Sequence, residues 1–94
     1  VLDVGCGDGS LGVKLKEKGA EVIGIEKDNQ LYLHAKKKLN NAFCMDAEEV
    51  KLPYPRGYFD CILCADILEH LRDPLSTLIK LSYYLGRNGA IITS

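Results

Sequence analysis

Five short apolar segments, rich in Val, Ile and Leu, recur along the chain, and stretches with helical periodicity separate them. Continuous apolar runs of this kind are typical of strands that are covered on both faces. Because strands that alternate with helices form parallel sheets, the pattern predicts an α/β fold. The predicted strands are residues 1–4, 21–25, 41–45, 59–65 and 89–94.

Three of the intervening segments have the spacing and the end signals of helices. The first is residues 10–17, and the second begins after Asp28, a good N-cap. The third begins after Asp73 and is predicted to end before Gly86. The apolar side chains expected to face the sheet are Leu11 and Leu15 in the first helix, Leu31, Ala35 and Leu39 in the second, and Leu75, Leu78, Ile79 and Leu85 in the third.

Length and composition fit one α/β domain. The chain has 94 residues, of which 47% are hydrophobic and 27% charged, an ordinary mixture for a soluble domain. We expect one domain, residues 1–94, with an open, mostly parallel Rossmann-like sheet and helices on both faces, which makes three layers. Because an open parallel sheet would have a raw edge here, we also expect the sequence to be a segment of a longer fold.

The overall charge excludes some classes of partner. A net charge of -1 and a pI of about 6.1 give no attraction to nucleic acid or to anionic lipid. No apolar run approaches the ~20 residues that cross a bilayer, and the first residues lack the features of a signal peptide. We therefore expect a cytoplasmic protein that acts on a small-molecule substrate, with no nucleic-acid or membrane partner.

Two of the four cysteines, Cys61 and Cys64, have the CxxC spacing of a zinc site. Both lie in the predicted strand 59–65, where residues three apart point to opposite faces. We interpret them as small apolar side chains and expect no metal site.

The segment VLDVGCGDGS places an aspartate, Asp3, in an apolar strand and follows it with Gly5, Gly7 and Gly9. Glycine permits positive φ and lets a ligand approach the backbone, and the first strand-to-helix turn of such a sheet is where ligands bind. Buried Asp3 needs hydrogen bonds, which N–H groups of the turn would supply. The turn departs from the dinucleotide pattern GxGxxG at Ser10, and a tight, well-packed turn is the alternative interpretation.

Two further carboxylates end predicted strands. Glu26 stands where an acidic side chain accepts hydrogen bonds from both hydroxyls of a ribose; its alternative role is to complement the next helix dipole. Asp46 ends the third strand, and with Glu49 it has the spacing of a capping box, a role compatible with ligand binding. Together with Asp3, these carboxylates suit a ligand with hydroxyls, an amino group and a positive centre, and would repel pyrophosphate.

In this order, the segments resemble the class I S-adenosylmethionine-dependent methyltransferases, in particular the group that acts on small molecules. VLDVGCGDG is similar to the family's first motif, VIGIEKD to its acidic second strand, CMDAEEVKLPYPRGYFD to its third strand and loop, and LCADILEHLRDP to its fourth strand end. LSYYLGRNGAIITS resembles the following helix and fifth strand, with GRNGA in place of the usual proline-glycine pair. The resemblance implies that the C-terminal strands of the full fold are missing.

The resemblance also implies S-adenosylmethionine as the cofactor and a set of residues around it. The cofactor-binding residues would be Asp3, Gly5, Cys6, Gly7 and Gly9 at the methionine part, Glu26 at the ribose, Lys27, Asp46 and Ala47 at the adenine, and Cys64 and Ala65 at the methionine end.

The implied reaction is transfer of a methyl group to an oxygen, nitrogen or carbon of a small-molecule acceptor. A hydroxyl acceptor needs a base, and His70, just past the predicted fourth strand, is the one plausible local candidate. Packing or capping is an equally open role for His70. Two alternative functions remain: a nicotinamide-dinucleotide-binding dehydrogenase domain, which the glycine turn and Glu26 favour, and a regulatory module that binds S-adenosylmethionine without activity.

Overall fold

The computed structural model describes all residues from 1 to 94 and contains one parallel five-stranded sheet. The strands are β1 (Leu2–Val4), β2 (Ile23–Glu26), β3 (Asn41–Cys44), β4 (Phe59–Cys64) and β5 (Leu85–Thr93), arranged in the order β3-β2-β1-β4-β5. The helices are α1 (Ser10–Glu17), α2 (Asn29–Lys38) and α3 (Pro74–Ser82), and two short 3-10 turns are η1 (Ala47–Glu49) and η2 (Leu68–His70). All five predicted strands are present.

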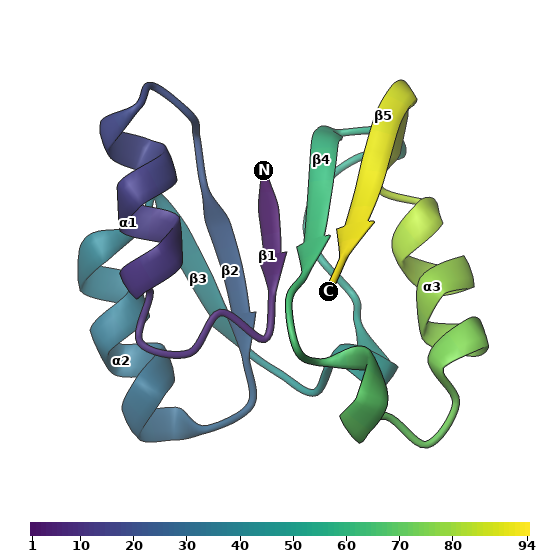
Figure 1. The fold of residues 1–94 in the computed structure, drawn as a ribbon, viewed down its shortest axis with the longest axis horizontal. Coiled ribbons are helices and arrows are strands. Elements are labelled where there is room, and N and C mark those ends of the chain that lie inside the picture. The colour runs from purple at the N-terminus through teal and green to yellow at the C-terminus, as the bar shows by residue number, and fades with distance from the viewer.

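Helices cover both faces of the sheet, which confirms the predicted three layers. Figure 1 shows α1 and α2 together beside β1 to β3, and α3 on its own beside β4 and β5. Each face has its own apolar core. The α3 face is built from side chains that include Leu2, Ile25, Ile62 and Leu81, and the α1/α2 face from Cys6, Val22, Ala35, Leu39 and Ala42.

The strand order reverses beside β1, and this places the ligand-binding edge. From β1 the chain runs outward through β2 to β3 and then returns to place β4 on the other side of β1. The connections after β1 and β4 leave toward opposite layers (Figure 1), and such a reversal point is where ligands bind in sheets of this kind.

Aspartates begin two of the helices as predicted. Asp28 accepts hydrogen bonds from the backbone N–H groups of Gln30 and Leu31 at 2.9 and 3.0 Å, and Asp73 accepts from that of Ser76 at 3.1 Å. Each carboxylate therefore pairs N–H groups that have no partner inside the helix.

The predicted end of α3 and its predicted buried face are wrong. The helix ends at Ser82, and Leu85 belongs to β5, where it pairs with Phe59 before a register shift. Its buried side chains are Thr77 and Leu81. The apolar residues of this helix lie on more than one of its sides, so sequence spacing does not select the buried face. Thr77 can be buried because its hydroxyl donates to the Asp73 carbonyl at 3.2 Å. On the opposite side, Leu75 and Ile79 are 69% and 62% exposed.

Two other side chains predicted to face the sheet are exposed. Leu11 of α1 and Leu31 of α2 are 46% and 39% exposed, whereas Gly12 and Ala35 of the same helices are buried. The reason is close packing of the helix pair, because a Cβ on Gly12 would lie only 2.6 Å from Leu39. Gly12 therefore lies in the contact between the helices, and Leu11 and Leu31 remain outside it.

Candidate cofactor site at the carboxyl edge of the sheet

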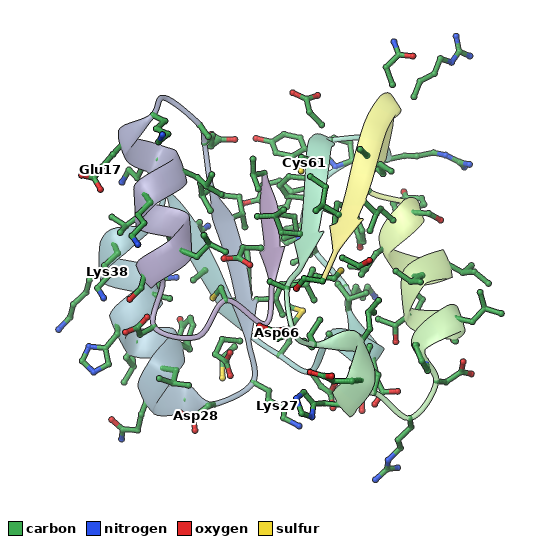
Figure 2. The ribbon with its side chains drawn as sticks, in the orientation of Figure 1. Glu17, Lys27, Asp28, Lys38, Cys61 and Asp66 are labelled. Carbon is green, nitrogen blue, oxygen red and sulfur yellow. The ribbon has the colours of Figure 1, made fainter.

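A cavity of about 380 Å³ opens at the carboxyl ends of the strands. Its lining residues come from the C-terminal ends of the first four strands and from the segments that follow them. Figure 2 shows two of its residues, Lys27 and Asp66, at this edge, whereas Cys61 lies toward the other end of β4. Seven residues predicted from the sequence line the cavity: Gly5, Glu26, Lys27, Asp46, Ala47, Ala65 and His70.

The other predicted site residues do not line the cavity. These are Asp3, Cys6, Gly7, Gly9 and Cys64. Six lining residues were not predicted: Ile25, Met45, Glu48, Asp66, Ile67 and Leu71. The rule that found Glu26 and Asp46, an acidic residue just past a strand end, would also have found Asp66. Sequence offers no comparable signal for Glu48, one of two adjacent glutamates.

The three glycines of the first turn serve different purposes. All have positive φ, 73° at Gly5, 58° at Gly7 and 90° at Gly9. A Cβ on Gly5 would lie 2.6 Å from the Ile67 side chain, and one on Gly9 would lie 3.1 Å from the Ala35 backbone, while nothing lies within 4 Å at Gly7. Gly5 and Gly9 therefore make room for the protein itself, and only Gly7 faces open space.

Replacement of Gly9 by alanine should destabilise the fold more than the same change at Gly19. Both glycines have positive φ, but only Gly9 has backbone atoms against it. The left-handed conformation costs about 1–2 kcal/mol in either variant, and overpacking adds about 1–3 kcal/mol at Gly9. Urea unfolding of Gly9→Ala and Gly19→Ala measures the difference. Equal losses would show that α2 does not press on the turn.

Glu26 receives the hydrogen bond from the glycine turn that was predicted for Asp3. The Gly7 N–H donates to Oε1 of Glu26 at 3.0 Å, and the Asp28 N–H donates to Oε2 at 2.9 Å. The Gly5 and Cys6 N–H groups donate instead to the Ile25 carbonyl. The turn thus folds toward β2 and away from Asp3. Each Glu26 oxygen keeps a lone pair for a further donor, so the anchored carboxylate is preorganised to accept two hydroxyls.

Asp3 is a buried carboxylate without a partner. It is 2% exposed, and its Oδ2 is buried and accepts no hydrogen bond. Burial, together with the negative charge of Glu26, raises the pKa of Asp3 to about 6. Burial and then the charge of Asp3 raise the pKa of Cys6 to about 12 and that of Cys64 to about 11. A positive ligand group near Asp3 would relieve this concentration of negative charge.

The buried carboxylate of Asp3 should make the fold less stable as the pH rises through 6. Its pKa is about 6 in the fold, against 3.8 for an unperturbed aspartate, so the folded state holds the proton more tightly between these values and stability falls with rising pH. Relative to Asp3→Asn, the wild type should lose about 2 kcal/mol between about pH 4.5 and about pH 7.5. Urea unfolding at both pH values measures this, with Asp60→Asn as an exposed control. A constant difference would contradict the assignment.

Asp46 caps the turn that follows β3. Its Oδ1 accepts the Glu48 N–H at 3.0 Å, and its backbone carbonyl accepts the Glu49 N–H. The Glu49 side chain forms no hydrogen bond, so the reciprocal half of the predicted capping box is not made. The second oxygen of Asp46 carries no protein donor, and the residue lines the cavity, which leaves this oxygen available to accept from a ligand amino group.

The segment after β4 forms the opposite wall of the cavity. Asp66 has φ of 55°, an uncommon conformation for a residue other than glycine, and it turns the chain so that Ile67 packs over Gly5. His70 ends η2, with its Nε2 3.6 Å from Oε1 of Glu69, and both side chains are exposed. The imidazole therefore lies at the mouth of the cavity and is free to contact a second molecule there.

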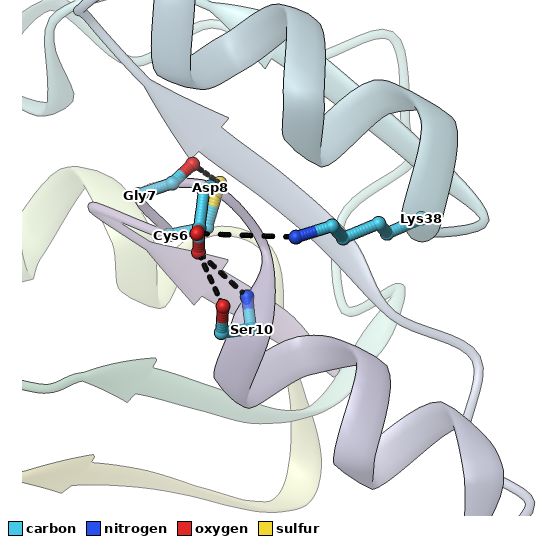
Figure 3. Close-up of polar contacts among 5 residues, drawn as sticks. All are labelled: Cys6, Gly7, Asp8, Ser10 and Lys38. Carbon is cyan, nitrogen blue, oxygen red and sulfur yellow. Dashed lines mark hydrogen bonds and ion pairs between the residues drawn. The ribbon is translucent and has the colours of Figure 1, made fainter.

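A separate polar cluster fixes the start of α1. Figure 3 shows Asp8 accepting two hydrogen bonds from Ser10, with Lys38 of α2 approaching from the other side. The distances from Oδ1 are 2.6 Å to the hydroxyl and 3.0 Å to the N–H, and Lys38 Nζ lies 3.8 Å from Oδ2. The Ser10 bonds, with a smaller effect of Lys38, lower the pKa of Asp8. Asp8 therefore has a structural role beside the cavity.

These features fit the cofactor implied by the sequence. S-adenosylmethionine has a positive sulfonium, an amino group, two ribose hydroxyls and an adenine. The site region offers the carboxylates of Glu26 and Asp46, which backbone N–H groups hold in place, and that of Asp3, which has no partner. At Gly7 nothing lies within 4 Å of the position that a Cβ would take. No lysine or arginine pairs with these carboxylates, so a pyrophosphate would meet uncompensated negative charge.

Comparison with known proteins separates the methyltransferase interpretation from the dehydrogenase alternative. The model of the family described as "Methyltransferase domain" matches residues 2–93. The chain belongs to the methyltransferase domain family. The match extends over the glycine turn, the cavity and β5 of this methyltransferase domain, in agreement with the resemblance seen in the sequence. The comparisons give no support to the nicotinamide-dinucleotide alternative.

Curated relatives include ubiquinone biosynthesis O-methyltransferases. That of Colwellia psychrerythraea is 37% identical over 100 residues, which cover 100% of this chain and 40% of the relative. That of Thiobacillus denitrificans is also 37% identical over 100 residues, covering 100% of this chain and 43% of the relative. The methyltransferase domain described here thus spans about two fifths of the length of these relatives.

Solved structures share the fold. A SAM-dependent methyltransferase from Archaeoglobus fulgidus superposes with a TM-score of 0.84 at 27% identity, covering 96% of this chain and 41% of that one. The plantazolicin methyltransferase BpumL, in complex with a desmethyl plantazolicin analog and SAH, has a TM-score of 0.86 at 25% identity, covering 98% and 37%. The [4+2]-cyclase SpnF has a TM-score of 0.85 at 22% identity, covering 98% and 36%. The reaction must therefore be argued from the site, since the fold supports more than one.

Proposed function

We propose that residues 1–94 are the S-adenosylmethionine-binding core of an enzyme that transfers a methyl group to a small-molecule acceptor. The observation that carries the proposal is the Glu26 carboxylate, held by two backbone N–H groups at the cavity with a lone pair free on each oxygen. Membership in the methyltransferase domain family supports the same assignment.

The chain's own residues would bind the cofactor in three places. Glu26 would accept from the ribose hydroxyls, with the stem of Lys27 beside the adenine. Asp46 would accept from the adenine amino group, with Ala47 adjacent. Asp3 would supply negative charge beneath the methionine part, where Gly5, Cys6, Gly7 and Gly9 shape the loop and Cys64 and Ala65 border the end of β4.

The sulfonium supplies an activated methyl group when the cofactor is bound. The protein then has to orient the acceptor and exclude water, effects that contribute roughly 7–11 kcal/mol to such reactions. The wall formed by Ile67, His70 and Leu71 faces the cofactor residues across the cavity and is suited to that task. His70 would accept the proton of a hydroxyl acceptor.

The acceptor class follows from the relatives and from the composition of the site. Two relatives are named as O-methyltransferases of ubiquinone biosynthesis, so an oxygen acceptor is the first choice for this chain, ahead of nitrogen or carbon. Its net charge of -1 favours a small molecule over a nucleic acid.

No helix has the length and apolar character needed to span a membrane. We propose a cytoplasmic location.

A labelled-methyl assay tests the proposed reaction. The protein, in its full natural length, is incubated with S-adenosylmethionine carrying an isotope in the methyl group and with phenol, amine and carbon-acid acceptors. We expect label in a phenolic product together with S-adenosylhomocysteine. Binding of S-adenosylmethionine with no transfer to any acceptor would instead favour a regulatory module without activity.

A further inference from the structure

The side chain of Glu48 joins the two walls of the cavity. Its Oε2 accepts hydrogen bonds from the backbone N–H groups of both Arg72 and Asp73, each at 3.0 Å. Glu48 lies in η1, directly after β3, whereas Arg72 and Asp73 connect η2 to α3. One carboxylate oxygen thus spans from the wall that contains Asp46 to the end of the wall that contains His70.

The Glu48 backbone is held in place as well. Its N–H donates to Oδ1 of Asp46 at 3.0 Å, and its carbonyl accepts from Nζ of Lys80, in α3, at 2.6 Å. Glu48 is therefore fixed to the residue proposed to contact adenine and to the helix that follows the opposite wall. A carboxylate fixed in this way has little freedom to release the two N–H groups.

The end of the segment between β4 and α3 depends on this bridge. At the start of the segment the Asp66 N–H donates to the Ser94 hydroxyl at 3.2 Å. Farther along, the N–H groups of His70 and Leu71 donate to carbonyls three residues earlier, at 2.9 and 3.2 Å. The N–H groups of Arg72 and Asp73 have Glu48 as their only acceptor in the protein. Loss of that carboxylate would leave both to water and would detach the end of the segment from η1.

We propose that Glu48 is a positioning residue that couples cofactor binding to the acceptor wall, residues 66–71. The inference rests on the function proposed above. A ligand bound to Asp46 would also restrict the motion of η1. The Glu48 carboxylate, through its hydrogen bonds to the N–H groups of Arg72 and Asp73, would then restrict the end of the acceptor wall. The acceptor wall is then ordered when the cofactor is present, which protects the methyl group from water until both substrates are in place.

Amide hydrogen exchange at Arg72 and Asp73 tests the coupling. Exchange is measured with and without S-adenosylhomocysteine in the wild type, Glu48→Ala, Glu48→Gln and Glu49→Ala. Glu49 is the matched control because it is the adjacent glutamate, is exposed and forms no side-chain hydrogen bond. We expect the ligand to slow exchange by about tenfold in the wild type and in Glu49→Ala, and to have no effect on these amides in Glu48→Ala.

Activity and affinity separate positioning from binding. Glu48→Ala should lower kcat by about tenfold, and because the coupling is reciprocal it should raise the Kd for S-adenosylhomocysteine by about tenfold at most, well short of the effect expected of Glu26→Ala. Glu48→Gln keeps an acceptor oxygen and should recover most of the protection and of kcat. The Gln variant also keeps the test valid if the Ala variant is poorly folded.

Three results would overturn the inference, and they can be told apart. Wild-type protein that binds S-adenosylhomocysteine without protection of Arg72 and Asp73 would remove the coupling and leave the proposed function intact. Protection that persists in both Glu48 variants would assign it to another contact. No binding of the ligand to the wild type would remove the proposed function, and the inference would fall with it.

Discussion

Glu26→Ala is expected to weaken S-adenosylmethionine binding by roughly 150-fold, or about 3 kcal/mol, through loss of two charge-assisted hydrogen bonds to the ribose. The structure adds a second reason. The same carboxylate holds the Gly7 and Asp28 N–H groups, so its removal also loosens the turn over which the ligand would lie. Isothermal titration calorimetry of the wild type and the variant measures the change.

The controls for Glu26 separate its two roles. Glu17→Ala removes an exposed glutamate from α1 and should leave the affinity unchanged. Glu26→Gln keeps one acceptor oxygen but turns an amide NH₂ toward one of the two N–H donors, so its affinity should lie between those of wild type and Glu26→Ala. If Glu26→Ala binds as tightly as the wild type, Glu26 does not belong to the site.

His70→Gln should lower kcat for a hydroxyl acceptor by about 10²–10⁴-fold, the usual contribution of a general base. His70 lies at the mouth of the cavity on the acceptor side, and its ring nitrogen contacts only the exposed Glu69. No hydrogen bond to the core would be lost, so stability should not change. The measurement is a steady-state rate profile against pH.

The matched control for His70 is His34→Gln, in the exposed part of α2 away from the cavity. His34→Gln should keep the wild-type kcat that His70→Gln loses. Affinity for S-adenosylhomocysteine should be the same in all three proteins. An unchanged kcat in His70→Gln would assign His70 a packing role only, and the base would then have to come from the acceptor or from elsewhere in the full-length protein.

The sheet could be predicted from the sequence because the signals for its strands and for the helix starts lie within short segments of the chain. Each strand is a short, continuous apolar run, and Asp28 and Asp73 begin helices by bonding to N–H groups two or three residues away. Parallel pairing then brings successive strand ends to one edge. This is why Glu26 and Asp46, residues far apart in the chain, were predicted to share a site and do line one cavity.

The features that the sequence did not predict depend on contacts between distant segments of the chain. The helix α3 has apolar residues on more than one side, so only packing shows that Thr77 and Leu81 face the core. Asp3 was expected to bind the glycine turn, but the path of that turn, set by positive φ at its glycines, presents the Gly7 N–H to Glu26. Glu48 could not be found, because the N–H groups that donate to its carboxylate, those of Arg72 and Asp73, lie more than twenty residues away.

The central claim is that the carboxylates of Asp3 in β1, Glu26 at the end of β2 and Asp46 in the turn after β3 form a site for an adenosyl sulfonium. Calorimetric titration of the protein with S-adenosylmethionine, followed by a separate titration with NAD, tests it most directly. The account predicts saturable binding of one S-adenosylmethionine per chain and no binding of NAD. Binding of NAD alone, or of neither molecule, would contradict it.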